Sequence, residues 1–386
     1  MNPKQNQMGK RKETVLAICY DFDKTLTPDD MQAQGYIQSV GYDVKKFWDE
    51  SNALAKANNM DKNLAYMLKM KEKAKGRMVL SREKLQEYGS RIKLFPGVED
   101  WFDRTKKLGK KVGIKVEHYI ISSGLKEMIE GTSLAKRKAF KKIYASSFYY
   151  NERGVAKWPA QIVNFTNKTQ FLFRIEKGFL DINDDRVNAF IPPEKMRVPF
   201  RNIVYIGDSD TDIPCMKLVN SSGGFSIGVY NPETGVKDKV FQMALENRIS
   251  YFCPADYSEG TELDLLISTI IQFVAVRSKL EQEVLRCRKE AQNDKRDKDL
   301  ADGINDINQL RISRQTDWNG LMKESRLLAS LVSRSYPLKQ FQEAIDALMK
   351  DVRDPIDQLT KIPLPSFSFT IPYPRFPWEG NEDNQK

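Results

Sequence analysis

The sequence predicts an α/β fold built on a doubly wound parallel sheet, with an all-helical insert and a helical C-terminal extension. Short apolar runs alternate with amphipathic helical patterns, an order typical of a parallel sheet covered on both faces. Between the first apolar run and about residue 92, apolar residues recur only at helical spacing. Beyond about residue 280 the strand patterns stop and highly charged helical patterns follow, which indicates a further helical region.

We expect the 386 residues to form several regions. They are a polar, disordered N-terminus (1–13), an α/β core in two pieces (14–27 and 93–278), a helical insert (28–92), a helical extension (279–360) and a proline- and aromatic-rich tail (361–386). The tail is expected to lie as a strap over the core or to be disordered, with docking to a protein partner as the alternative.

The first strand is predicted over residues 15–20, a short apolar run of the kind found in buried strands. Directly after it, Thr27, Pro28 and Asp30 have the pattern of a helix N-terminus, with Thr27 as the N-cap and Asp30 completing a capping box. Helical periodicity then continues to about residue 92, and Ser81 is a candidate N-cap within it.

The second piece of the core alternates strands and helices. A helix that opens at Thr166 or Asn167 is predicted up to residue 178, and Thr261 is a candidate N-cap for a helix over 262–270. Another amphipathic helix is expected after the proline and glycine of "LFPG", over residues 98–109. Strands are predicted at 116–121, 141–150, 201–207, 223–229 and 249–256.

Composition excludes several classes of protein. Four scattered cysteines without a CxxC pair and a single histidine, His118, argue against a zinc site, and the cysteines fit a reducing compartment. No secretory leader is evident and the longest apolar run is too short to span a bilayer, so we expect a cytoplasmic protein that does not bind membranes. The net charge of +10 is spread over clusters such as 106–115 and 136–142, which we interpret as solvated helix faces rather than a nucleic-acid site.

Carboxylates and small polar residues stand at the ends of three predicted strands. Asp21 and Asp23 follow the first strand, Ser122 follows the second, and "GDSDTD" follows the apolar run at 203–206. Ligands gather at the carboxyl ends of parallel strands, so we expect these residues to meet. A divalent cation would offset the repulsion between the carboxylates, and an all-oxygen ligand set selects Mg²⁺ over zinc.

The segments "DFDKT", "IISSG", Lys168 at the head of "KTQFLFRIEKG" and "GDSDTD" occur in the order of the four motifs of the haloacid dehalogenase-like hydrolases. The chain resembles that family over about residues 14–275. The resemblance implies a Rossmann-like core, and it implies that the helical insert is a cap of the phosphoserine-phosphatase-like kind.

The resemblance also implies roles for individual residues. Asp21 matches the nucleophile and Asp23 the general acid and base, while Thr25 belongs to the first motif, which shapes the phosphate-binding loop. Ser122, with Ser123 as its rival, and Lys168, with Lys157 as its replacement candidate, match the phosphate-binding residues. Mg²⁺ is expected on Asp21, the Asp23 carbonyl and Asp208, with Asp212 supporting the site; the role of Asp210 stays open.

The function implied is Mg²⁺-dependent hydrolysis of a small phosphomonoester through an aspartyl-phosphate on Asp21. A phosphotransferase of the same family is the nearest alternative, because it differs only in the acceptor of the phosphoryl group. An interaction protein acting through the C-terminal extension is a second alternative. The intact acids weigh against it, since a scaffold has no physical reason to hold repelling carboxylates together.

Overall fold

The computed structural model of the chain describes residues 13–312, with side chains described up to residue 305. The chain forms two compact units, Met1–Val284 and Leu285–Lys386. The second unit is described only over the part of helix α11 (Glu262–Ile312) that it contains. The predicted helical extension beyond residue 312 and the tail at 361–386 lie outside the described residues.

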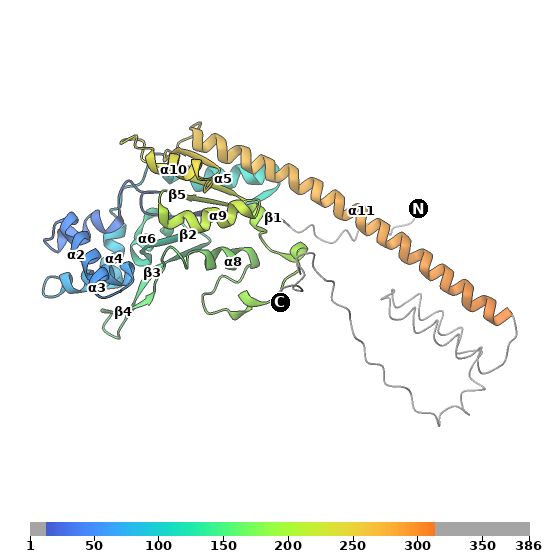
Figure 1. Cartoon of the computed structure of the whole chain (residues 1–386), viewed down its shortest axis with the longest axis horizontal. Coiled ribbons are helices and arrows are strands. Elements are labelled where there is room, and N and C mark those ends of the chain that lie inside the picture. The colour runs from blue at the N-terminus through green and yellow to red at the C-terminus, as the bar shows by residue number, and fades with distance from the viewer. Residues whose placement is uncertain (1–12, 313–386) are drawn as a thin grey trace, which may run out of the picture. The chain divides into compact units, whose positions relative to one another are not determined.

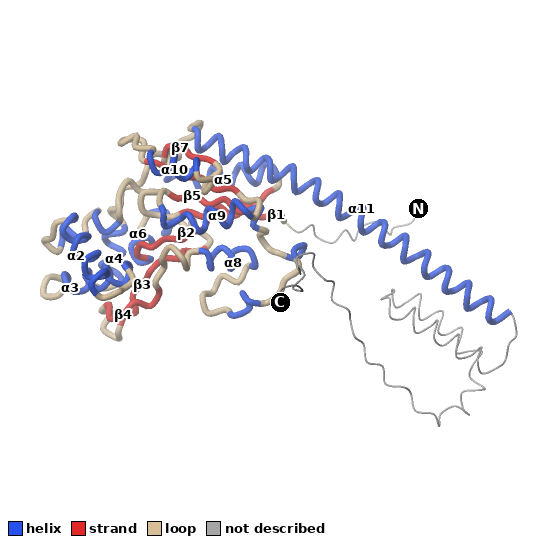
Figure 2. Tube along the Cα trace, in the orientation of Figure 1, coloured by secondary structure: helices blue, strands red, loops and turns tan. Residues whose placement is uncertain are grey.

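The core of the first unit is a seven-stranded sheet in the order β4-β3-β2-β1-β5-β6-β7 (Figures 1 and 2). All neighbouring pairs run parallel except β3 and β4, which are antiparallel. The strands are β1 (Thr14–Tyr20), β2 (Ile114–Leu125), β3 (Lys142–Tyr150), β4 (Ala156–Gln161), β5 (Ile203–Gly207), β6 (Phe225–Tyr230) and β7 (Tyr251–Pro254). The predicted α/β class with a doubly wound parallel sheet is thereby confirmed.

Strand β4 was not predicted from the sequence. Its segment, "AKWPAQ", alternates poorly and contains Pro159, which removes a backbone donor. It forms a strand because it lies at the edge of the sheet, where one side of the backbone needs no ladder partner.

Helices cover both faces of the sheet, and successive side chains of β1 pack against helices on opposite faces. Leu16, Ile18 and Tyr20 pack into one hydrophobic cluster with α5 (Val98–Val112), the start of α11 and the helical insert. The intervening residues Val15, Ala17 and Cys19 pack into a second cluster with α8 (Thr169–Lys177), α9 (Ile213–Ser221) and α10 (Asp238–Leu245). Both faces of β1 are therefore buried, as its continuous apolar run predicts.

The helical insert follows β1 and lies at one end of the sheet (Figure 1). It consists of η1 (Met31–Ala33), α1 (Tyr36–Ser39), α2 (Val44–Ala57), α3 (Lys62–Ala74) and α4 (Arg82–Gly89). Ser81 caps α4 by accepting a hydrogen bond from the Lys84 N–H at 3.2 Å, as predicted. The insert positions its inner residues over the carboxyl ends of β1 and β2, as described below.

Two predicted helix starts are wrong. No helix begins at Thr27: its Oγ1 donates to the Asp29 carbonyl at 2.9 Å, and the chain makes turns until η1 begins at Met31. Helix α8 begins at Thr169, because the Asn164 side chain accepts hydrogen bonds from the N–H groups of Thr166 and Asn167 and holds them in a turn. In both places a local side-chain bond competes with the helix.

The remaining elements complete the connections between strands. They are α6 (Lys126–Gly131), α7 (Ser133–Lys136), η2 (Asp185–Asn188), η3 (Pro193–Lys195), η4 (Phe200–Asn202) and η5 (Asp210–Asp212). Helix α11 begins after Thr261, as predicted, and runs without interruption through the charged pattern beyond residue 280. Within the described residues, no helix is both long and apolar enough to cross a membrane.

Candidate active site

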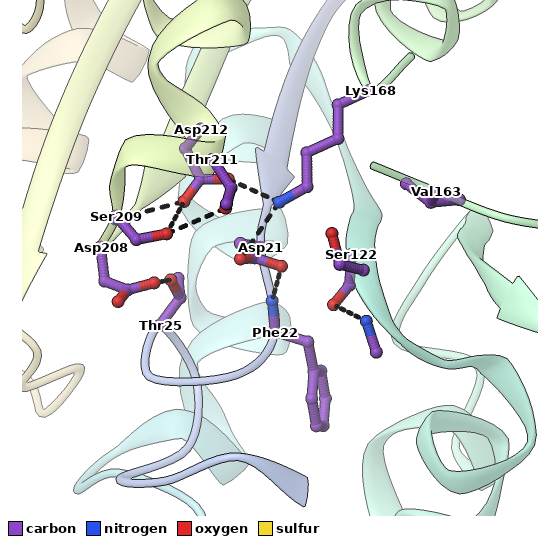
Figure 3. Close-up of polar contacts among 12 residues, drawn as sticks. Asp21, Phe22, Thr25, Ser122, Val163, Lys168, Asp208, Ser209, Thr211 and Asp212 are labelled. Atoms are coloured by element: carbon purple, nitrogen blue, oxygen red, sulfur yellow. Dashed lines mark hydrogen bonds and ion pairs between the residues drawn. The ribbon is translucent and has the colours of Figure 1, made fainter. Parts of the chain in front are cut away.

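The candidate site lies where β1, β2 and β5 end, at the carboxyl edge of the sheet (Figure 3). Strand β1 pairs with both other strands, so Asp21, the residue after it, stands between them. The Asp21 N–H donates to the Ile206 carbonyl at 3.0 Å, which ties the end of β1 to the end of β5. Parallel register therefore brings together residues that are far apart in the sequence.

Lys168 lies fully buried between two aspartates. Its Nζ is 3.2 Å from Asp21 Oδ2 and 2.7 Å from Asp212 Oδ1, and Asp212 is also fully buried. The Tyr205 hydroxyl donates to the same Asp212 oxygen at 2.9 Å. Burial by itself would lower the pKa of Lys168, but the charges of Asp21 and Asp212 outweigh burial and raise it. The lysine is thus held in its charged form at the centre of the site.

The carboxyl groups of Asp21, Asp208 and Asp212 form one cluster. Each offers an oxygen that lies within 4.8 Å of the others. Burial raises the pKa of Asp21 to about 6, even though Lys168 opposes the shift. Burial and the charges of Asp212 and Asp21 raise the pKa of Asp208 well above its ordinary value. The cluster holds more negative charge than Lys168 neutralises.

This donor set fits a hard divalent cation. Three carboxylates offer only oxygen, which suits Mg²⁺ and does not suit zinc. Burial, and after it the neighbouring carboxylates, raises the pKa values of Asp21 and Asp208, and a bound cation would oppose both effects. Asp21, Asp208 and Asp212 are therefore the residues that would hold the ion.

Short hydrogen bonds fix the two predicted catalytic aspartates. Asp21 Oδ1 accepts from the Phe22 N–H at 2.7 Å, and Asp23 Oδ1 accepts from the Met31 N–H at 2.8 Å. A Cβ on Gly124 would lie 2.2 Å from Met31 Cε and 2.8 Å from Asp23 Oδ2, so a glycine there leaves room for both side chains. Burial, and after it the charges of Asp30 and Asp21, raises the pKa of Asp23 well above its ordinary value.

Ser122 and Ser123 both line the hollow at the site. The Ser122 hydroxyl accepts from the Gly124 N–H at 3.1 Å, and the Ser123 carbonyl accepts from the Tyr66 hydroxyl of the insert at 2.8 Å. Both serines remain candidates for the phosphate-binding hydroxyl, as the sequence left them.

The structure gives Thr25 a supporting position. Its side chain is fully buried and donates to Asp208 Oδ1 at 3.3 Å, while its carbonyl accepts from the Tyr257 hydroxyl at 2.8 Å. Neither Thr25 nor Lys168 is among the described residues that line the hollow. Both lie behind the carboxylates, so their contact with a substrate phosphate stays a prediction.

Of the other residues that the sequence offered for the site, Lys157 and Asp210 lie outside the carboxylate cluster and Asp212 belongs to it. Lys157 lies exposed near the start of the edge strand β4, whereas Lys168 contacts the carboxylates. The Asp210 side chain is 74% exposed and lies 4.0 Å from Lys239, outside the carboxylate cluster. Asp212 accepts from the Ser209 N–H at 3.3 Å, so it also stabilises the turn that follows β5.

A hollow of about 490 Å³ lies over the carboxylates, and the helical insert supplies part of its wall. Sequence reasoning did not identify these residues as part of the site. Asp61, for instance, has the pattern of an N-cap and does cap α3, by accepting from the Asn63 N–H at 2.7 Å. The insert residues in the wall are Gln32, Trp48, Met60, Asp61, Lys62, Asn63 and Tyr66.

Fold and site together define a doubly wound α/β protein with a carboxylate cluster at the carboxyl edge of its sheet. The chain belongs to the haloacid dehalogenase-like hydrolase family, whose model matches residues 18–217. The resemblance inferred from the sequence is thereby confirmed.

Individual relatives were also found. An uncharacterized protein of Borreliella burgdorferi is 26% identical over 275 residues, which cover 65% of this chain and 95% of the relative. A crystal structure of a family hydrolase from Salmonella enterica serovar Typhi aligns with a TM-score of 0.44 at 16% identity, over 66% of this chain and 70% of that one. A probable phosphoserine phosphatase from Vibrio cholerae aligns with a TM-score of 0.44 at 12% identity, over 69% of each chain.

Proposed function

We propose that the protein is a Mg²⁺-dependent phosphatase that hydrolyses a small phosphomonoester through an aspartyl-phosphate on Asp21. The observation that carries the proposal is the contact of buried Lys168 with Asp21 and Asp212, beside Asp208 and behind a hollow that Asp21 and Asp208 line. This arrangement holds a carboxylate nucleophile next to a fixed cation and to oxygen ligands for a metal.

The bound Mg²⁺ would offset the negative charge of the carboxylates and of the phosphate that enters between them. Asp208 and Asp212 would hold it together with Asp21, and the Asp23 carbonyl is a further proposed ligand. Thr25 holds Asp208 by a hydrogen bond, so the ligand is oriented before the ion binds.

In the first step, a carboxylate oxygen of Asp21 attacks phosphorus. The new O–P bond forms as the bond from phosphorus to the leaving oxygen breaks, and Asp23 donates its proton to that oxygen. The raised pKa of Asp23 suits a group that must carry a proton near neutral pH. The phosphoryl group is then bonded to Asp21.

In the second step, Asp23 takes a proton from water while the water oxygen attacks phosphorus. The bond between phosphorus and Asp21 breaks, so phosphate leaves and the free carboxylate is restored. Lys168 stays charged throughout and stabilises the Asp21 carboxylate as the negative charge on it changes.

The hollow supports a small substrate. Its volume of about 490 Å³ fits a small phosphorylated molecule, and the insert that forms part of its wall acts as the proposed cap. All four cysteines are unpaired and three of them are buried, which supports the proposal that the enzyme works in the reducing cytoplasm.

Phosphate release from p-nitrophenyl phosphate tests the proposal. With Mg²⁺ we expect turnover by the wild-type protein and a loss of about a thousandfold or more in Asp21→Asn, because the amide cannot attack phosphorus. Asp210→Asn is the matched control, because it removes an exposed carboxylate outside the cluster. An equal loss in both variants, or the absence of metal-dependent turnover over a panel of phosphomonoesters, would contradict the proposal.

A further inference from the structure

A second hollow, of about 580 Å³, lies at the opposite edge of the sheet. Its lining runs from Glu13, just before β1, through Gly113 to His118 at the start of β2. The candidate active site, by contrast, uses residues at the carboxyl ends of these strands. The two hollows are therefore separate sites at opposite ends of β1 and β2.

Lysines from two distant segments meet in this second hollow. Helix α5 and the start of β2 contribute one group, and the segment after α7 contributes the other. These segments hold the two clusters, 106–115 and 136–142, that the sequence presents as solvated faces. The lysines in the lining are Lys106, Lys110, Lys115, Lys138 and Lys141.

Among the described residues, four of these five lysines make no ion pair with a carboxylate. Of the two acids in the lining, Glu13 pairs with Lys115 at 3.3 Å. Both carboxylate oxygens of Glu117 accept hydrogen bonds from Arg197 Nη2, at 2.6 and 2.7 Å. Over residues 13–305, no ion pair joins Lys106, Lys110, Lys138 or Lys141 to a carboxylate. Four like charges therefore share one concave surface, and their mutual repulsion favours an anion.

Two of these lysines are held at some energetic cost. Lys106 is half-buried and its Nζ donates to the Ala139 carbonyl at 2.9 Å, while burial lowers its pKa. Lys138 follows α7 with φ of +57°, a left-handed conformation that is uncommon for residues other than glycine and asparagine. Strained or partly desolvated charged residues of this kind cluster at binding sites.

We propose that this second hollow binds a small anion that carries several phosphate groups, through Lys106, Lys110, Lys138 and Lys141. Four ammonium groups that make no ion pair match a multiply charged anion better than a single phosphate. The concave shape favours a small molecule over a nucleic acid, which needs an extended basic track with exposed aromatic platforms. The proposal does not depend on the phosphatase activity, because no residue of the active-site hollow takes part.

Calorimetric titration of the full-length protein with inorganic tripolyphosphate tests this proposal. The titration is run without Mg²⁺ to avoid chelation, with orthophosphate as the low-charge comparison. We expect one tripolyphosphate per chain and weaker binding of orthophosphate. Lys110→Gln/Lys138→Gln should bind tripolyphosphate about tenfold or more weakly, because two charge-assisted contacts are lost.

The matched control is Lys107→Gln/Lys136→Gln. It removes the same charge from α5 and α7, at exposed lysines that do not line the hollow. We expect its affinity to stay within about twofold of the wild type, since exposed charges outside the hollow are screened by water and salt. An equal loss in both double variants would show non-specific charge attraction and overturn the proposal.

Three further outcomes would also overturn it. Unchanged binding in Lys110→Gln/Lys138→Gln would place the anion elsewhere, including in the active-site hollow. Orthophosphate binding as tightly as tripolyphosphate would remove the argument from multiple charge. A single-stranded oligonucleotide that binds more tightly than tripolyphosphate, and loses affinity in the same variant, would assign the hollow to nucleic acid.

Discussion

At the scale of single residues, the three clustered carboxylates carry more negative charge than the one buried lysine beside them neutralises. Lys168 contacts Asp21 and Asp212, yet burial and mutual repulsion still raise the pKa of Asp208. Removing a charge from such a cluster relieves repulsion when no metal is present. The same carboxylate stabilises the fold once a cation binds to it. The effect of removing it on the free energy of unfolding should therefore change sign when Mg²⁺ is added.

Thermal unfolding with and without Mg²⁺ checks this expectation. Saturating Mg²⁺ should stabilise the wild type, by about 2.7 kcal/mol at one hundred times its dissociation constant. Asp208→Asn should be at least as stable as the wild type without metal and should lose most of the metal-dependent gain. Asp210→Asn, with a side chain outside the cluster, should keep the gain. The assignment of the ligands is wrong if Asp208→Asn gains as much as the wild type.

His118, the single histidine of the chain, lies fully buried in a hydrogen-bond network. The Thr105 hydroxyl is 2.9 Å from the Trp101 carbonyl and donates there, so His118 Nε2 donates to Thr105 at 3.2 Å. His118 Nδ1 then accepts from the Tyr20 hydroxyl at 3.0 Å. Burial, together with the charge of Lys106, lowers the pKa of His118 to about 3.

This lowered pKa predicts a loss of stability in mild acid. The unfolded chain binds a proton on His118 near its ordinary pKa of 6.5, whereas the folded chain does not until about pH 3. The stabilisation is therefore complete above pH 6.5 and falls with the pH, by about 2 kcal/mol between pH 7 and pH 5. Urea unfolding should show this extra loss in the wild type and not in His118→Gln. Parallel pH profiles would contradict the prediction.

At the scale of elements, helix α5 is bounded by two glycines in the same left-handed conformation. Gly97 has φ of +74° at its N-cap, and Gly113 has φ of +80° at its C-cap. A Cβ on Gly97 would lie 2.2 Å from the Ser258 nitrogen, while a Cβ on Gly113 would meet nothing within 4 Å. The neighbouring Tyr257 holds the Thr25 carbonyl, so Gly97 fixes a loop that supports the first motif.

Alanine substitutions at these two positions separate backbone strain from close packing. Gly113→Ala should cost about 1 kcal/mol of unfolding free energy, from the left-handed conformation alone. Gly97→Ala should cost about 3 kcal/mol or more, because the backbone of residues 257–258 must also move. Urea denaturation measures both values. Equal losses would show that packing against Ser258 contributes nothing.

At the scale of the whole molecule, all described parts of the candidate site lie in the first compact unit. The start of α11 belongs to the core of this unit, where Leu263, Ile267, Ile271 and Val274 are buried. The Ser278 hydroxyl lies 2.6 Å from that of Thr14, and Glu281 pairs with Arg201 at 2.8 Å. The first unit therefore needs α11 at least as far as these contacts.

Two truncations test this division. A chain that ends at Val284 should stay folded and keep its activity within about twofold, because it retains every contact of the first unit. A chain that ends at Thr261 should be insoluble, since the apolar side chains that α11 covers become exposed. Solubility, circular dichroism and phosphate release provide the readouts. Loss of folding in the longer truncation would show that residues beyond 284 stabilise the core.

Much of the α/β core followed from local sequence patterns. The apolar run of β1 and the acids that end β1 and β5 are local features, and parallel pairing then brings Asp21 and Asp208 together without further information. Local patterns failed where another interaction competed, as in the turn made by Asn164 before α8. They also failed at β4, whose proline is tolerated only because the strand lies at the edge.

The sequence by itself determined the family, because the acids at the strand ends, the serine and the lysine occur in the order of the family's motifs. Only the tertiary structure decided which residues share a surface. It placed Thr25 and Lys168 behind the carboxylates, gave the insert's Trp48 and Lys62 a place in the wall of the active-site hollow, and joined two separate lysine clusters at the second hollow. The physical reason is that these contacts link segments far apart in the chain, so they depend on how the elements pack and leave no periodic signal in the sequence.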